Sequence, residues 1–164
     1  TRTNGAITIL RGPLVYSLRI GKDYRRVVTT DYYCVPNRFT FKGTADWEIR
    51  PTTAWNYGLI IDAANPDASF TVRRNDIGRF PFADIGDVVY LDEESAFAKW
   101  MGEAPVVLTA RGRKIPEWRL RNNSADDPPP SPVLTPEPVE SIVLVPYGCT
   151  RLRITEFPVV RELP

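Results

Sequence analysis

Histidine is absent from this chain of 164 residues. Its absence removes the commonest general base, the commonest metal ligand and the Ser–His and Cys–His nucleophile pairs. Only two cysteines, Cys34 and Cys149, are present, and two cannot make a cysteine zinc site by themselves. Whether they form a disulfide or stay reduced is left open by the sequence. We therefore predict no catalytic residue, no metal site and no cofactor in this chain.

Net charge and long apolar runs are lacking as well. The 21 basic residues nearly balance the 20 acidic ones, so bulk charge does not favour binding to nucleic acid or to an anionic membrane. No apolar run approaches the roughly 18 residues that a membrane helix needs. The one basic cluster with an aromatic residue, around Trp118 in residues 111–121, is interpreted as a strand end and turn rather than a nucleic-acid grip. We predict neither a nucleic-acid nor a membrane partner.

The residues that are abundant favour strands. Val, Ile and Thr number 40, aromatic residues add 18, and proline is high at 16. We expect strands over residues 6–11, 13–20, 46–50, 54–62, 69–74, 87–91, 105–111, 117–121, 139–147 and 150–157. Only residues 92–101 resemble a helix, with Asp92 as its cap. This pattern predicts an all-β fold, an antiparallel β-sandwich of jelly-roll type with at most one short helix.

Residues 1–164 are expected to form one domain. Alternation along the strands places Trp55, Tyr57, Leu144, Leu152 and Ile154 in its core. Residues 122–138 contain six prolines and are predicted to cross the surface as an extended loop, covering a sheet edge over residues 128–138. The strand at residues 6–11 is the edge that we expect to be exposed.

Two kinds of carbohydrate site were considered. Trp47, Trp100 and Trp118 lie nearer to loops than the other large aromatic residues and are candidates for a sugar-stacking surface, although core packing is the alternative for each. A glycosidase needs two carboxylates facing each other across a cleft, which sequence spacing does not establish here. The acidic residues were therefore interpreted as solvated surface groups; they are Asp46, Glu48, Asp62, Asp92, Glu93, Glu94, Glu103 and Glu117.

An ordered set of motifs resembles a known family. The stretches are Arg11-Gly12-Pro13-Leu14-Val15-Tyr16, Trp55-Asn56-Tyr57-Gly58-Leu59, Arg111-Gly112-Arg113-Lys114-Ile115-Pro116-Glu117-Trp118, Pro130-Ser131-Pro132-Val133, and Val145-Pro146-Tyr147-Gly148-Cys149-Thr150 running into Leu152-Arg153-Ile154-Thr155-Glu156-Phe157-Pro158. Over roughly residues 9–158 they resemble the C-terminal region of bacterial β-L-arabinofuranosidase-like proteins, glycoside hydrolase family 127 and its relatives. Members of that family carry a helical (α/α)6 catalytic barrel followed by β-sandwich domains.

The resemblance implies a role without catalysis. The family's cysteine nucleophile, its zinc and its glutamate acid/base lie in the helical barrel, and Cys149 does not match the nucleophile's context. The resemblance therefore implies an accessory β-sandwich that packs against the catalytic barrel and against a second protomer. A carbohydrate-binding module that uses exposed Trp and Tyr side chains is the alternative, and a self-sufficient enzyme is the third hypothesis. Burial or exposure of the tryptophans distinguishes the first two.

Overall fold

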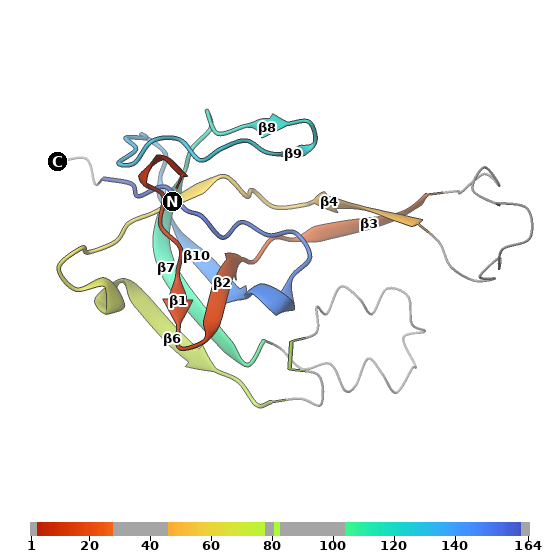
Figure 1. The fold of residues 1–164 in the computed structure, drawn as a ribbon, viewed down its shortest axis with the longest axis horizontal. Helices are drawn as coiled ribbons and strands as arrows, with labels where there is room; N and C mark the ends of the chain where they lie inside the picture. Colours follow the sequence, from red (N-terminus) through yellow and green to blue (C-terminus); the bar gives the residue numbers. More distant parts are fainter. Residues whose placement is uncertain (1–2, 28–45, 78–80, 83–103, 162–164) are drawn as a thin grey trace, which may run out of the picture.

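The computed structural model describes residues 3–27, 46–77, 81–82 and 104–161. Its main feature is a curled antiparallel sheet (Figure 1). The strand order is β1 (Leu10–Arg11), β2 (Leu14–Leu18), β10 (Val139–Pro146), β7 (Val106–Lys114) and β5 (Tyr57–Leu59), with β6 (Phe70–Arg74) also paired to β7. Helical turns in the described part are 3-10 only: η1 (Thr3–Gly5), η3 (Pro66–Ser69) and η6 (Tyr147–Cys149). The predicted all-β, antiparallel fold class is confirmed.

Residues 157–160 join the two ends of this sheet. The backbone of Ile7 exchanges two hydrogen bonds of 2.8 Å with Phe157, and Leu59 of β5 receives one from Val160 at 2.8 Å while donating one to Pro158 at 2.9 Å. The N-terminal segment and β5 are therefore linked through the C-terminal segment. Closing a sheet on itself removes the unpaired edges that an open sheet would present.

This closure corrects two predictions made from the sequence. Residues 150–157, predicted to be a strand, do not pair with the neighbouring β10, because β2 and β7 already occupy both sides of that strand. They run instead as an extended segment with isolated pairings. The strand predicted at residues 6–11 is not an open edge along its whole length, since Ile7 pairs with Phe157 and only Leu10–Arg11 continues as β1.

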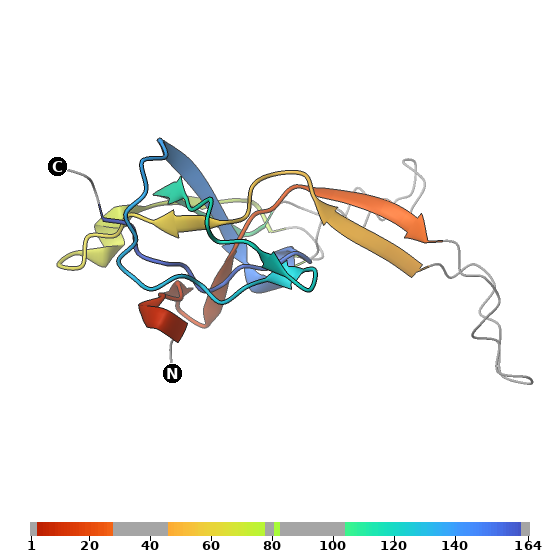
Figure 2. The same cartoon turned by 90° about the horizontal axis from the view of Figure 1, so that it is seen from above.

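A separate two-stranded ribbon extends away from the curled sheet (Figures 1 and 2). It consists of β3 (Lys22–Val27) and β4 (Asp46–Pro51), paired antiparallel. At its base Thr52 N donates to Gly21 O at 2.8 Å. A third pair, β8 (Leu120–Arg121) and β9 (Ser124–Ala125), turns through Asn122 and Asn123, which both adopt positive φ. Two central residues with positive φ suit the right-handed twist of a tight hairpin.

The core lies inside the curl of the sheet. Tyr16, Leu59, Leu144 and Phe157 are fully buried there and come from three strands and the C-terminal segment. Of the residues predicted to be in the core, Tyr57 and Leu144 are buried, whereas the three others are half-buried and pack against its surface; these are Trp55, Leu152 and Ile154.

The Pro-rich segment is held to both ends of the described chain. Ser131 N donates to Asn4 O at 2.9 Å, and Ser131 Oγ accepts from Val159 N at 3.0 Å. Val133 pairs in parallel with Val160. The segment therefore lies next to the closing residues 157–160. The strand predicted at 87–91, the helix predicted at 92–101 and Cys34 lie outside the described residues.

Candidate functional sites

Trp118, a candidate for sugar stacking, is an interior residue with 4% of its surface exposed. Its indole N–H donates to Asp126 O at 2.7 Å, and its ring meets Trp55 edge-on with centroids 5.3 Å apart. Asn56 fixes the local backbone by donating to Ile115 O at 2.9 Å. Because its polar atom is satisfied and its ring is packed, Trp118 has no open face on which a sugar could stack.

The other two candidates are placed less completely. Trp47 lies in β4 and its backbone pairs with Arg26, whereas Trp100 lies outside the described residues. The backbone of Trp47 therefore lies in the ribbon, whereas Trp118 lies in the loop between β7 and β8. Among the described residues, these two tryptophans come from separate elements.

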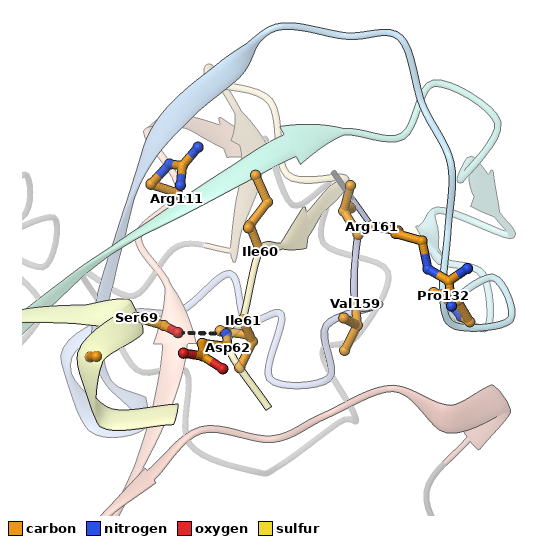
Figure 3. Close-up of a pocket in the computed structure, with 10 residues that line it drawn as sticks. Ile60, Ile61, Asp62, Ser69, Arg111, Pro132, Val159 and Arg161 are labelled. Atoms are coloured by element: carbon orange, nitrogen blue, oxygen red, sulfur yellow. Dashed lines mark hydrogen bonds between the residues drawn. The ribbon is translucent and has the colours of Figure 1, made fainter. Parts of the chain in front are cut away.

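One pocket that combines charged and apolar walls has a volume of about 640 Å³ (Figure 3). We call it the arginine pocket; it is lined by Ile60, Ile61, Asp62, Ala68, Ser69, Arg111, Pro132, Val159, Val160 and Arg161. It forms where β5 and β6 diverge along β7, since Leu59 pairs with Gly112 and Phe70 with Ala110. The residue between these two pairings is Arg111.

Three segments give the arginine pocket its chemistry. Arg111 comes from β7 and Arg161 from the C-terminal segment, and they lie on opposite sides of the pocket in Figure 3. Asp62 and Ser69 come from the loop between β5 and β6, where Asp62 N donates to Ser69 Oγ at 2.8 Å. Asp62 is the only carboxylate among the lining residues. The pocket therefore does not hold the facing carboxylate pair that glycoside hydrolysis uses.

A second concavity is apolar. It has a volume of about 390 Å³ and is lined by Pro13, Leu14, Val15, Phe82, Pro146, Tyr147, Gly148 and Thr155. We call it the apolar groove. Phe82 and Tyr147 are 49% and 47% exposed, so two large rings present about half of their surface at the same groove. The guanidinium carbon of Arg153 lies 4.2 Å from the centre of the Tyr147 ring, so a cation stands beside the apolar surface.

A cluster of titratable groups lies on another part of the sheet. Tyr57 O–H donates to Glu140 Oε2 at 2.9 Å, and Lys114 Nζ pairs with Glu140 Oε1 at 3.1 Å. The hydrogen bond from Lys114 is the main cause that lowers the pKa of Glu140, and the hydrogen bond from Tyr57 lowers it further. The bond between Lys114 and Glu140 also raises the pKa of Lys114. Burial raises the pKa of Tyr57. Each shift stabilises the form already present at neutral pH, which is typical of a structural bridge and unsuited to proton transfer.

These sites could be predicted from the sequence only in part. Arg111 belonged to the basic cluster and Asp62 to the surface acids, and neither motif indicated a shared pocket. Arg161, Phe82 and Tyr147 were not singled out. A signal existed for Tyr147, because it follows Pro146 at the end of a strand, where a large ring has no core position to fill.

Other kinds of site were sought in the part of the chain that the structure describes. No group of three or more His, Cys, Asp or Glu residues there could hold a metal ion. None of the described helices has the length and apolar character that membrane crossing demands. Comparison with known protein-family models, with curated proteins and with solved structures finds no match to this chain.

Proposed function

We propose that this chain is a non-catalytic accessory domain of a glycoside hydrolase resembling the β-L-arabinofuranosidases. Its role is to pack against the catalytic (α/α)6 barrel of the parent enzyme and to support it. The observation that carries the proposal is the apolar groove, in which Phe82 and Tyr147 are about half exposed. Burying such rings against another domain removes apolar surface from water.

The surroundings of the groove support docking rather than solvent exposure. Its apolar lining includes the prolines Pro13 and Pro146, which cannot donate backbone hydrogen bonds. A barrel surface can therefore cover these two positions without leaving their backbone nitrogens as unsatisfied donors. Arg153 beside Tyr147 adds a charge that an acidic residue of the partner would complement.

The proposal is tested with the complete reading frame that encodes this chain. The region predicted to form a helical barrel is expressed separately, and its affinity for the purified chain is measured by calorimetry. We expect association at micromolar concentration. Phe82→Asp and Tyr147→Asp should weaken it by at least tenfold, because each buries a charge in the contact.

Leu120→Asp is the matched control, since Leu120 is 55% exposed in β8 and does not line the groove. It should leave the affinity unchanged. A reading frame without a helical region would overturn the proposal, as would equal affinities for all variants. The same titration with arabino-oligosaccharides addresses the carbohydrate-binding alternative: binding that is lost on Trp47→Ala or Trp100→Ala would favour that alternative.

A further inference from the structure

The arginine pocket shares no lining residue with the apolar groove. Its volume of about 640 Å³ falls in the range of roughly 300–1,000 Å³ typical of small-molecule sites. Its wall is built by segments that the fold holds together, because Ile60 N donates to Arg111 O at 2.9 Å and Leu59 exchanges hydrogen bonds with the C-terminal segment. A ligand would therefore enter a site whose backbone is already positioned.

The two arginines define the anionic part of the ligand. Arg111 and Arg161 flank the pocket from opposite sides (Figure 3). A guanidinium is always charged and presents a planar fork of donors that matches a carboxylate. Arg161 can therefore meet one carboxylate on the ligand with two parallel hydrogen bonds, and the charge of Arg111 adds to the positive potential of the pocket.

Asp62 restricts what else the ligand can carry. Its Oδ1 accepts from Ala64 N at 2.9 Å, and its carboxylate lies at the pocket with Ser69 beside it. A second negative charge on the ligand would be repelled there, whereas a hydroxyl could donate to Oδ2. Ser69 Oγ already accepts from Asp62 N, so its own O–H can donate. The wall formed by Asp62 and Ser69 thus suits hydroxyl groups.

Apolar side chains complete the lining. Ile60, Ile61 and Val159 offer C–H surface, and no aromatic residue lines the pocket. A ligand with one carboxylate, several hydroxyls and C–H faces satisfies all three parts of the wall. We propose that the arginine pocket binds a sugar acid, that is, a pyranose ring that carries one carboxylate.

This inference does not depend on the proposed docking function, because it concerns a different surface. The experiment is a titration of the 15N-labelled chain, followed by amide chemical shifts, with three probes: galacturonate, galactose and malonate. We expect galacturonate to move the amides of Ile61, Asp62, Ser69 and Arg161 in a saturable way. Galactose, which lacks the charge, should bind at least tenfold more weakly.

Two variants separate the parts of the site. Arg161→Gln should weaken galacturonate by about tenfold or more, the effect of losing one charge-assisted pair. Asp62→Asn keeps the Oδ1 acceptor for Ala64 but removes the negative charge. It should therefore weaken the binding of galacturonate and strengthen the binding of malonate. Arg74→Gln, an exposed arginine of β6 that does not line the pocket, is the control.

Three results would overturn the proposal. The first is the absence of saturable shifts at tens of millimolar galacturonate. The second is galactose binding as tightly as galacturonate, which would show that the carboxylate is not recognised. The third is malonate binding as tightly as galacturonate with both affected alike by Asp62→Asn, which would reduce the site to a general anion site.

Discussion

Replacing Phe157 by alanine tests the closure of the sheet directly. The side chain is fully buried, and the backbone of the same residue pairs with Ile7. Burying an aromatic side chain removes about 150–250 Å² from water, worth about 4–6 kcal/mol at about 25 cal/mol per Å². Alanine keeps a small part of that, so we expect Phe157→Ala to lower the free energy of unfolding by about 3–5 kcal/mol.

Such a loss is a large fraction of the total free energy of unfolding, which is roughly 5–15 kcal/mol for a domain of this kind. Urea unfolding followed by tryptophan fluorescence measures it, because Trp55 and Trp118 pack against each other in the neighbouring cluster. The midpoint should fall while the slope of the transition stays constant, as expected if stability alone has changed.

Phe82→Ala provides the same chemical change at a ring that is 49% exposed, and it should cost about 1 kcal/mol or less. The reasoning is refuted if Phe157→Ala costs less than about 1 kcal/mol, or if both variants lose the same amount. Either result would mean that the C-terminal segment does not complete the core.

Further predictions concern other parts of the domain. The hydrogen bond from Lys114 holds the pKa of Glu140 below the ordinary value of 4.5. The ionised Glu140 therefore stabilises the fold above pH 4.5, and this stabilisation is lost as the pH falls below the lowered pKa. The difference in unfolding free energy between the wild type and Glu140→Gln should therefore narrow in urea melts at lower pH. Trp118→Phe should cost about 1 kcal/mol in the same melts, because it removes the hydrogen bond from the indole N–H to the half-buried Asp126 carbonyl. Asn123→Ala should cost about 1–2 kcal/mol and Asn123→Gly little or nothing, because the residue has φ of 62°. The isolated chain should self-associate at micromolar concentration in the ultracentrifuge, less so with Tyr147→Asp; a wild-type chain that stays monomeric would count against a sticky groove.

Strands with a clear alternation could be predicted from the sequence. The expected segments 105–111 and 139–147 correspond closely to β7 (Val106–Lys114) and β10 (Val139–Pro146), the two central strands, because one of their faces meets the core. The strand β3 (Lys22–Val27) could not be predicted from alternation, since most of its residues are charged.

The route of the C-terminal segment could not be predicted from alternation. Residues 150–157 have the pattern of a half-buried strand, yet the neighbour that such a strand would take beside β10 is already occupied. Trp118 illustrates the same limit for sites: its position near a turn suggested exposure, and its burial depends on Trp55, which is 63 positions away. Contacts between distant segments, rather than local pattern, place both features.

The pairing of Ile7 with Phe157 has a consequence for how the chain reaches its fold. The two residues are 150 positions apart, so nearly the whole described chain must be synthesised before the curled sheet can close. Contacts of such long sequence separation slow folding, because loop-closure entropy is lost before the contact is gained. During synthesis on the ribosome, the core-facing side of β2 would therefore stay uncovered until residues 157–160 emerge. During this interval apolar surface that is buried in the finished fold is exposed, so this is when a chaperone would protect the domain from aggregation.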